Sequence, residues 1–509
     1  MSYKTHMHGG GESYSGVVPA KQPNKDGRPS AEAVEERPLT KENTEQSNQR
    51  RTPSRESGPS GLDRVRKAAK KGKLAKNEKI RFTALLHHVS VDLLRDSYHS
   101  LKKKAAPGVD GVTWQEYGEA LEARLSGLHG RIHSGAYRAR PSRRTWIPKG
   151  DGRQRPLGIA ALEDKVVQHA VGTVLNQIWE EDFLGFSYGF RPGRSQHDAL
   201  DALSVGIARK KVNWVLDLDI RSFFDKIEHG WMVKFVEHRI GDNRIVRLIQ
   251  KWLKAGVMEE GRWFETEEGT PQGAVISPIL ANLYLHYVLD LWVNQWRKKD
   301  ATGDVIIVRY ADDAVLGFQH QDEAERFLEQ LRERLGKFGL ELHPEKTRLI
   351  EFGRYAAERR KKRGEGKPET FNFLGFTHIC ETSRKTGRYT VGRQTIGKRM
   401  AAKLKDIQAK LRQRMHEAIG DTAQWLQSVV RGYFQYHAIP GNEERLKAFR
   451  KDVLRLWLRQ LRRQSQRSRW TWARFLELLG VLLPEVRILH PYPDARFDAK
   501  HIQGRNRVR

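Results

Sequence analysis

Cysteine is almost absent from this sequence, which has a single one, Cys380, in 509 residues. One cysteine excludes an internal disulfide and any zinc site built from several thiolates, and it fits a reducing compartment. No apolar run approaches the roughly 18 residues that a membrane-spanning helix needs. The first residues also lack the apolar stretch of a secretory signal. We therefore expect a cytoplasmic protein without a membrane partner.

Acidic residues are too few to balance the basic ones, with 62 Asp and Glu against 92 Lys and Arg and a formal net charge of +30. The excess is concentrated in two segments. Residues 353–415 hold 18 Lys and Arg against 5 Asp and Glu, and residues 445–474 hold 11 against 1. Such a charge indicates a polyanionic partner, above all a nucleic acid, with an anionic membrane surface as the weaker alternative.

Tryptophans lie among the arginines of the second basic segment, at Trp457, Trp470 and Trp472. Aromatic side chains interleaved with basic ones suit stacking on bases next to phosphate contacts. The same pattern is typical of a helix with a tryptophan core and a solvated basic surface. Both interpretations stay open at this point.

The N-terminal 60 residues are rich in Gly, Ser, Pro, Glu, Lys and Asn and poor in aromatic residues, which predicts a disordered tail. Beyond them, periodic apolar residues and turn residues predict alternating helices and strands. The expected elements are a helix from Glu78, two short strands over 144–160 around a turn at 149–152, a helix over 162–181, a strand running into a helix over 213–227, helical structure over 278–297, a hairpin over 305–318, an amphipathic helix over 321–338, a charged loop over 359–369 and nearly continuous helix beyond 395. The pattern predicts an α+β unit followed by a helical basic unit.

Two groups of carboxylates carry the chemical signal. In the predicted strand WVLDLDI, Val215, Asp217 and Asp219 share one face, where two aspartates repel each other unless a cation lies between them. In the predicted hairpin, Asp312 and Asp313 lie at the tip of a rigid element. If the tip lies beside Asp219, three hard oxygen ligands converge as in a Mg²⁺ site. Two such ions stabilise the attacking and leaving oxygens of an in-line phosphoryl transfer.

The residues around these carboxylates resemble the bacterial group II intron-encoded reverse transcriptases, also called maturases. Tyr310-Ala311-Asp312-Asp313 in a hairpin is their signature, and further blocks follow in the family's order. These blocks are PGVDGVTW, IPKGDGRQRPLGI, LEDKVVQHAV, YGFRPGRSQHDAL, DLDIRSFFDKIEH, GTPQGAVISPILANLYLHYVLD, RYADDAVLGF, LHPEKT, FNFLGF and VVRGYFQYH. The resemblance covers about residues 78–497. It points to the members without an HNH endonuclease domain, because that domain's paired cysteines are absent here.

The resemblance implies a right-hand polymerase, with fingers and an antiparallel palm sheet over 61–380 and an α-helical thumb or maturase domain over 381–475. A short basic DNA-binding tail would follow over 476–509. It implies that Asp219, Asp312 and Asp313 are the catalytic residues and hold two Mg²⁺ ions, with Mn²⁺ as an alternative. Asp217 is not one of the family's metal ligands.

Further residues match substrate-binding positions of the family. Phe224 would exclude the 2′-hydroxyl of a ribonucleotide, whereas Phe223 is expected in the core. Arg155 and Lys149 would bind the triphosphate of the dNTP, and Gln272 with Gly273 would pack against the incoming nucleotide. Lys346 would protonate the leaving pyrophosphate; a solvated loop lysine is the alternative.

The segment SYGFRPGRS mixes aromatic and guanidinium groups, and we expect Tyr188, Arg191 and Arg194 to contact the nucleic-acid template. Phe190 fits either that surface or the core. His197 and Asp198 resemble a hydrolytic pair, but no nucleophile accompanies them.

The predicted function is RNA-directed DNA synthesis together with splicing assistance and intron mobility by target-primed reverse transcription. The expected partners are the group II intron RNA, the DNA target and primer, and dNTPs, in a ribonucleoprotein of the bacterial cytoplasm or nucleoid. One alternative is a reverse transcriptase of a retron, a diversity-generating element or a phage-defence system. A second alternative is an RNA-binding splicing factor without polymerase activity, and a third, remote one is a basic structural protein of the nucleoid.

Overall fold

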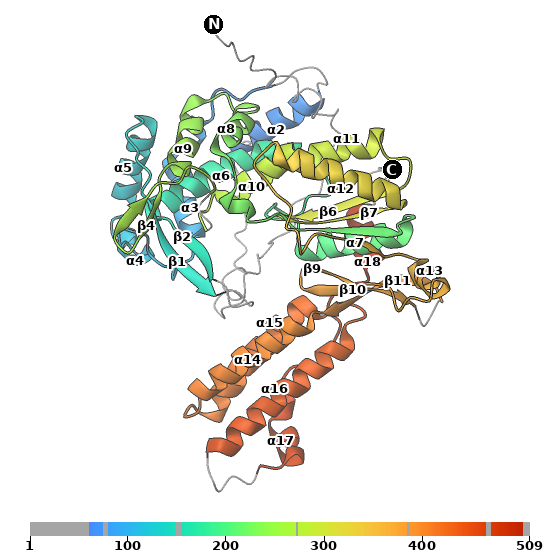
Figure 1. Cartoon of the computed structure of the whole chain (residues 1–509). Helices are drawn as coiled ribbons and strands as arrows, with labels where there is room; N and C mark the ends of the chain where they lie inside the picture. Colours follow the sequence, from blue (N-terminus) through green and yellow to red (C-terminus); the bar gives the residue numbers. More distant parts are fainter. Residues whose placement is uncertain are drawn as a thin grey trace.

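The computed structural model describes residues 61–74, 80–148, 154–270, 273–383, 387–464 and 470–501. The predicted tail over residues 1–60 lies outside these ranges. The described chain forms a broad lobe of helices and sheets, from which a bundle of helices projects (Figure 1). The lobe contains mixed elements and the bundle is helical, so the α+β prediction is confirmed.

The first helix in the described residues is α2 (Gly61–Leu74), and the next long one is α3 (Val91–Ser100). The predicted helix from Glu78 is wrong between residues 80 and 90, which hold only a 3₁₀ turn at Leu86–His88. Here the backbone N–H groups of Leu85 and Leu86 donate to the Asp242 carboxylate instead of to a helical carbonyl. Leu85, Leu86 and Val89 are buried as the apolar pattern suggests, but hydrogen bonds to Asp242 take the place of helical hydrogen bonds in this segment.

The fingers sheet has the strand order β2-β1-β4-β5. Its predicted hairpin is confirmed as β1 (Ser142–Pro148) and β2 (Gln154–Ile159), which pair antiparallel. β4 (Val257–Glu259) joins β1 in parallel and continues into β5 (Arg262–Phe264). The surrounding helices are α4 (Trp114–Gly118), α5 (Leu121–His133), α6 (Leu162–Asp182), α8 (His229–Glu237) and α9 (Asn243–Leu253). The predicted helix over 162–181 is α6, and most of its residues are buried.

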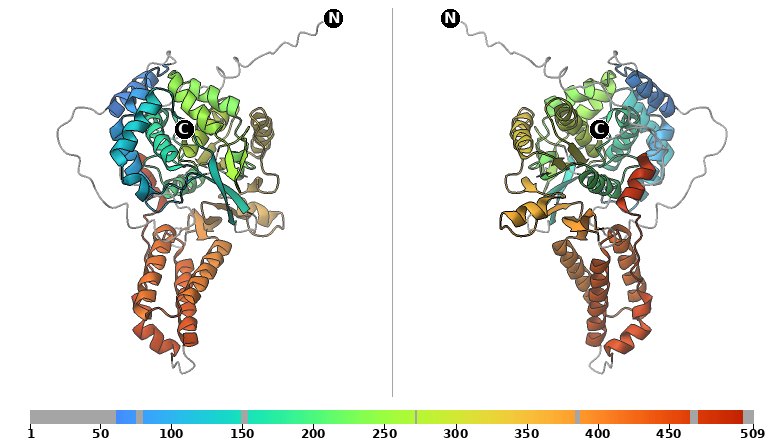
Figure 2. Two further views of the ribbon diagram at one scale, coloured as in Figure 1. Left: turned by 90° about the vertical axis from the view of Figure 1, so that its left-hand side faces the viewer. Right: turned by 90° about the vertical axis from the view of Figure 1, so that its right-hand side faces the viewer.

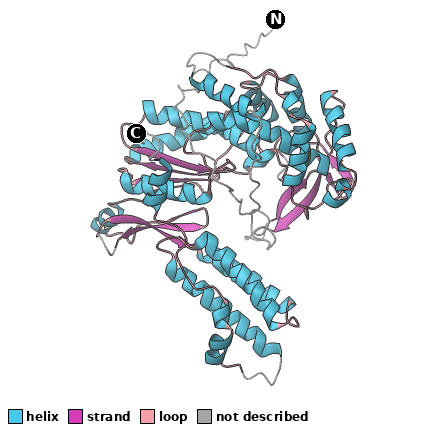
Figure 3. Cartoon of the chain, turned by 180° about the vertical axis from the view of Figure 1, so that it is seen from behind, coloured by secondary structure: helices cyan, strands magenta, loops and turns pink. Residues whose placement is uncertain are grey.

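The palm sheet is antiparallel with the order β6-β7-β3-β8, and its strands are β3 (Trp214–Leu218), β6 (Val305–Tyr310), β7 (Asp313–Phe318) and β8 (Arg348–Glu351). Figure 3 shows these strands between helices on either side. One face packs on α12 (Gln321–Gly336) through Leu216, Leu316 and Phe318. The other face packs on α7 (Gln196–Arg209) through Val215 and Val315. The predicted hairpin and amphipathic helix are confirmed, whereas the helix expected after β3 is only the 3₁₀ turn Phe223–Asp225.

Helices α10 (Ser277–Leu285) and α11 (Leu291–Lys299) are joined by a π-helical turn at His286–Asp290, so the predicted helical region 278–297 is confirmed. A third sheet below the palm has the order β11-β10-β9, with β9 (Phe371–Phe373), β10 (Phe376–Thr382) and β11 (Tyr389–Thr395). The predicted loop over 359–369 is wrong at its start, because α13 (Ala356–Lys362) forms there. An ion pair between Lys362 and Glu358, one turn apart on α13, stabilises this short helix.

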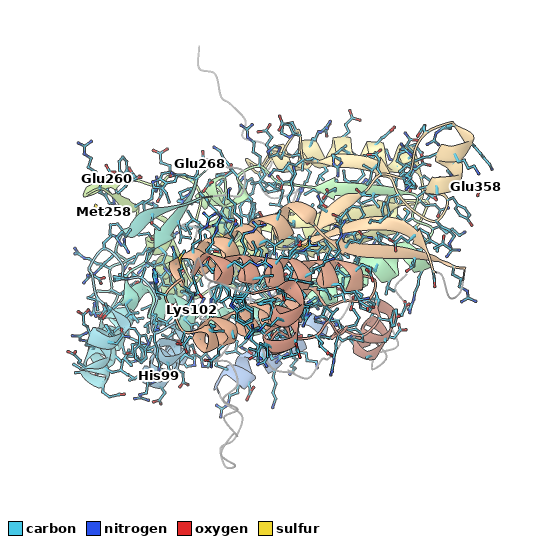
Figure 4. The ribbon with its side chains drawn as sticks, turned by 90° about the horizontal axis from the view of Figure 1, so that it is seen from below. His99, Lys102, Met258, Glu260, Glu268 and Glu358 are labelled. Atoms are coloured by element: carbon cyan, nitrogen blue, oxygen red, sulfur yellow. The ribbon has the colours of Figure 1, made fainter. Side chains whose placement is uncertain are left out.

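The thumb is the helical bundle of residues 397–483, built from α14 (Gly397–Gln413), α15 (Ile419–His437), α16 (Glu443–Gln464), α17 (Trp472–Leu478) and a 3₁₀ turn at Gly480–Leu482. It has a hydrophobic core of its own, and both views of Figure 2 show it projecting from the lobe. Viewed from below, the thumb helices lie between the fingers end, marked by Glu260, and the opposite end, marked by Glu358 (Figure 4). Helical structure beyond residue 395 is thereby confirmed.

The C-terminal helix α18 (Pro493–His501) returns to the palm and packs on α7. Arg209 of α7 pairs with Asp498 at 2.8 Å, and Lys500 pairs with Asp198. The expectation of a separate tail from residue 476 is therefore wrong for residues 476–501. Its first part completes the thumb core through Leu483, and its second part is docked on the palm. None of the described helices is both long and apolar enough to cross a membrane.

Candidate active site

The turn between β6 and β7 carries two of the predicted catalytic residues. Tyr310 pairs with Asp313 across the hairpin, so Ala311 and Asp312 form its tip. Ala311 has a φ of 57°, a left-handed conformation that costs a residue with a Cβ roughly 1–2 kcal/mol. The surrounding structure must compensate for this cost, because nothing in the alanine itself favours the conformation.

Asp219 follows directly on β3, the strand that pairs with β7. The antiparallel register pairs Asp217 with Val315 and Leu218 with Ala314, so the next step of the ladder brings Asp219 beside Asp313. The predicted meeting of the strand and the hairpin is therefore present in the fold. The main-chain carbonyl of Asp219 accepts hydrogen bonds from the His343 N–H at 2.8 Å and the Thr347 hydroxyl at 3.2 Å.

The carboxylates influence one another strongly. Although the Asp313 side chain is still exposed to solvent, the protein around it displaces much of its water and raises its pKa to about 7, and repulsion from Asp312, Asp219 and Asp217 adds to the shift. Burial likewise raises the pKa of Asp312, against the opposing effects of its own backbone N–H and of Arg155. Burial and the nearby Asp219 raise the pKa of Asp217 to about 6, although Arg348 lies 3.9 Å away. The carboxylates repel one another, and a further cation bound between them would relieve that repulsion.

The donor set fits a divalent cation. Asp219, Asp312 and Asp313 offer hard oxygen atoms from adjacent strands of one rigid sheet, as Mg²⁺ prefers. In the part of the chain that the structure describes, no three His, Cys, Asp or Glu side chains are already gathered as a closed metal site. Instead, the Lys346 ammonium lies 3.1 Å from Oδ2 of Asp219 and neutralises it. A divalent cation would compete with this lysine for the same oxygen.

The predicted nucleotide-binding residues surround the same cluster. Phe224 lies on the turn after Asp219, and its carbonyl accepts the Thr270 N–H at 2.8 Å, which joins it to the loop that carries Gly273. Gly273 has a φ of 110°, and a Cβ there would lie 2.9 Å from the Gly158 carbonyl oxygen on β2. Arg155, also on β2, is close enough to Asp312 to lower its pKa. Lys149 and Gln272 lie outside the described residues.

The side chains expected at the template do not form one exposed surface. Arg191 is 3% exposed, and its guanidinium binds the Glu180 carboxylate at 2.6 Å and two main-chain carbonyls. Tyr188 is 6% exposed. The prediction of template contact is wrong for these two residues, because their side chains are enclosed by the protein. Arg194 lies over the Tyr188 ring and donates to the Gly185 carbonyl at 2.6 Å, so its guanidinium already has a role inside the protein.

Several residues for which the sequence allowed either a functional or a structural role have a structural role in the fold. Phe223 and Trp457 are buried, and Trp470 and Trp472 pack against the thumb core, so the core interpretation holds for the tryptophans. Asp198 caps the first turn of α7.

Sequence reasoning missed the residues beneath the catalytic turn. Arg309 is fully buried and binds Asp290, Asn282, Ser187 and the Ala311 carbonyl. The available signal was an arginine inside the otherwise apolar strand VIIVRY. A charge at such a position needs buried partners.

Comparisons with known proteins agree with this geometry. Residues 147–378 match the family model described as reverse transcriptase (RNA-dependent DNA polymerase), a span that contains all three aspartates. Protein YkfC of Escherichia coli K12 is 38% identical over 285 residues, which cover 49% of this chain and 74% of YkfC. The chain belongs to the reverse transcriptase family.

Other relatives of this reverse transcriptase are intron-encoded. The group II intron-encoded protein LtrA of Lactococcus lactis subsp. cremoris is 35% identical over 222 residues, 43% of this chain and 36% of LtrA. An uncharacterized 91 kDa protein in the cob intron of Schizosaccharomyces pombe is 38% identical over 178 residues, 35% of this chain and 22% of that protein. The match therefore spans only about a third of LtrA. The family as a whole generally uses divalent metals such as Mg²⁺.

Proposed function

We propose that this reverse transcriptase copies RNA into DNA for a group II intron, binds its intron RNA as a splicing maturase and supports intron mobility by target-primed reverse transcription. The observation that carries the polymerase part is the β3–β7 register, which brings Asp219 beside the Asp312–Asp313 turn. The relatives support the intron part, since several are encoded in introns.

In this proposal Asp219, Asp312 and Asp313 hold two Mg²⁺ ions, with Mn²⁺ as an alternative. Bound divalent ions supply positive charge, which favours ionisation of the primer 3′-hydroxyl and stabilises the leaving pyrophosphate. Lys346, whose ammonium lies 3.1 Å from Oδ2 of Asp219, is the proposed proton donor to that pyrophosphate. Arg155, and Lys149 with it, bind the triphosphate, while Gln272 and Gly273 hold the nucleotide against the template.

Phe224 is the proposed sugar-selecting residue. Its ring lies edge-on to Phe223 with centroids 5.3 Å apart, and its carbonyl is bonded to the loop before Gly273. A ring fixed in this way excludes a 2′-hydroxyl by steric contact, and that hydroxyl distinguishes a ribonucleotide from a deoxynucleotide.

The thumb is the proposed main binding surface for nucleic acid. Lys398, Lys405 and Arg412 are exposed and follow one another at seven-residue spacing along α14, which places them on one face of the helix. Such a row suits the phosphates of a nucleic-acid backbone, and the intron RNA would use the same kind of contact.

Primer extension on a poly(rA) template with an oligo(dT) primer and Mg²⁺ tests the polymerase proposal. We expect dTTP-dependent DNA products that chelation of the metal abolishes. Absence of products from folded protein would contradict the proposal and favour an RNA-binding splicing factor.

Splicing of the flanking intron RNA at low Mg²⁺, with and without the protein, tests the maturase proposal. Polymerase activity without RNA binding or splicing assistance would favour a reverse transcriptase of another system.

A further inference from the structure

We infer that the buried Arg309–Asp290 pair is a positioning device that holds the Ala311–Asp313 turn in its catalytic conformation. The inference rests on the proposed polymerase function. It assigns a role to residues that do not themselves touch the substrate.

The first support is the complete use of the Arg309 guanidinium, which is 0% exposed. Nε donates to Oδ1 of Asp290 at 2.7 Å, and Nη2 donates to Oδ2 of Asp290 at 2.6 Å and to the Ser187 hydroxyl at 2.7 Å. Nη1 donates to Oδ1 of Asn282 at 3.0 Å and to the Ala311 carbonyl at 2.8 Å. These five bonds match the five N–H groups of an arginine. A lysine has three donors and no planar fork, so it cannot replace them.

The second support is that one of the five bonds ends on the left-handed residue of the turn. Ala311 has no glycine-like freedom, and its peptide orientation decides where Asp312 and Asp313 point. A short hydrogen bond from a fixed cation to the Ala311 carbonyl holds that peptide in one orientation.

The third support is the rigidity of the anchor. Asp290 ends the π-helical turn between α10 and α11, and it is 0% exposed. Asn282 of α10 binds Arg309 through its carbonyl oxygen and donates through Nδ2 to the Gly189 carbonyl at 2.7 Å. π-Helical turns within α-helices frequently occur at functional sites, where they place side chains that a regular helix would direct elsewhere.

The fourth support is the segment before Phe190, which closes over the turn. Its main chain bonds to Arg309 on both sides, from the Tyr188 N–H to the Arg309 carbonyl at 2.8 Å and from the Arg309 N–H to the Phe186 carbonyl at 2.9 Å. A Cβ on Gly189 would lie 2.3 Å from the Ala311 nitrogen, so only glycine fits. This segment thus supports the catalytic turn from behind.

The test compares Arg309→Lys with a matched control, Arg334→Lys. Arg334 is also buried, and its guanidinium donates to two main-chain carbonyls of the same π-helical turn, those of Tyr287 and Val288, which lie outside the catalytic turn. We expect Arg309→Lys to lower kcat for primer extension by about 100-fold, because a small misplacement of reacting groups has effects of this size. The KM for dTTP and the Kd for primer–template should stay unchanged. Arg334→Lys should lower the melting temperature without lowering kcat.

Amide hydrogen exchange gives a readout that does not depend on activity. We expect faster exchange in peptides covering residues 309–314 for Arg309→Lys and wild-type exchange there for Arg334→Lys. Wild-type kcat in folded Arg309→Lys, or an equal loss of kcat in both variants, would overturn the inference. Absence of polymerase activity in the wild-type protein would instead overturn the proposed function, and the exchange comparison would still decide the inference.

Gly189→Ala provides the second variant if Arg309→Lys does not fold. It removes no buried charge, but its new methyl group displaces the Ala311 peptide. We expect reduced kcat with unchanged KM and Kd. Normal kcat in this variant would overturn the inference.

Discussion

The palm and the thumb both carry basic side chains, but they place them in opposite environments. In the palm, Arg309 is fully buried and its guanidinium is bonded in every direction. On the thumb, Lys398, Lys405 and Arg412 are exposed on one face of α14. Removing a bonded charge from a buried network is costly, so such a charge fixes a geometry. An exposed charge fixes little geometry but attracts a polyanion over a distance set by the salt concentration.

The strongest test of this contrast is Asp312→Ala, which should abolish the activity of the palm and leave RNA binding by the thumb intact. We expect loss of DNA synthesis by roughly 1000-fold or more, because metal coordination supplies several kcal/mol of transition-state stabilisation. Affinity for RNA should stay near the wild-type value, since the exposed basic rows are untouched. Primer extension and filter binding measure the two effects.

Asp322→Ala is the matched control for this variant, because Asp322 is an exposed aspartate in the first turn of α12. It should leave both activities unchanged. If Asp312→Ala abolishes RNA binding in a folded protein, the separation of palm chemistry from RNA binding is wrong.

Trp457→Ala tests whether the thumb is an independent unit. Trp457 is fully buried in the thumb core, which is a separate cluster from the cores of the lobe. Truncating such a side chain costs about 3–5 kcal/mol. We expect faster amide exchange in α14 to α17 and unchanged exchange in the palm strands. Equal destabilisation of both regions would show that they unfold together.

The sequence predicts the fingers and the palm well where the signal is local. The hairpin over 305–318 and the helix over 162–181 follow from apolar periodicity and turn residues alone. The prediction fails where the hydrogen-bond partners of a segment lie far away in the sequence. Residues 80–90 are held by Asp242, and Arg191 is enclosed by Glu180, a contact that no spacing rule anticipates.

The same distinction applies to the candidate site. The family motifs predict which aspartates meet, and the β3–β7 register agrees. The network beneath them joins Ser187, Asn282, Asp290 and Arg309 from four different elements or loops, so only the assembled fold reveals it.

Neutralising the basic row on the thumb should weaken binding without affecting chemistry. For the triple variant Lys398→Ala, Lys405→Ala and Arg412→Ala, the slope of log K against log salt concentration should become shallower by roughly 0.7–0.9 for each phosphate that the variant no longer neutralises. The rate at saturating primer–template should stay unchanged. Lys447→Ala is the control, because Lys447 is already paired with Glu443 at 2.9 Å. An unchanged salt slope would remove this face of α14 from the binding surface.

Phe224→Ala should relax sugar discrimination by about 10-fold or more, because a steric barrier disappears while the other nucleotide-binding groups remain. The ratio of kcat/KM for dTTP and UTP measures it. Phe224→Tyr keeps the ring and should keep the discrimination. If Phe224→Ala discriminates as the wild type does, another residue excludes the 2′-hydroxyl.

Arg209→Ala should have the smallest effect, although Arg209, like Arg309, forms ion pairs with aspartate. Its guanidinium joins α7 to Asp494 and Asp498 of α18, but its side chain is 47% exposed. Water already solvates these charges, so removing the pairs should lower the free energy of unfolding by no more than about 1 kcal/mol. The melting temperature of the variant should lie slightly below that of the wild-type protein at low salt. This difference should disappear at high salt, which screens the ion pairs in the wild-type protein, and kcat should not change. A large loss of kcat would mean that α18 also helps to hold the palm in its active conformation. An exposed ion pair on α7 would then fix a geometry, which contradicts the contrast between buried and exposed charges.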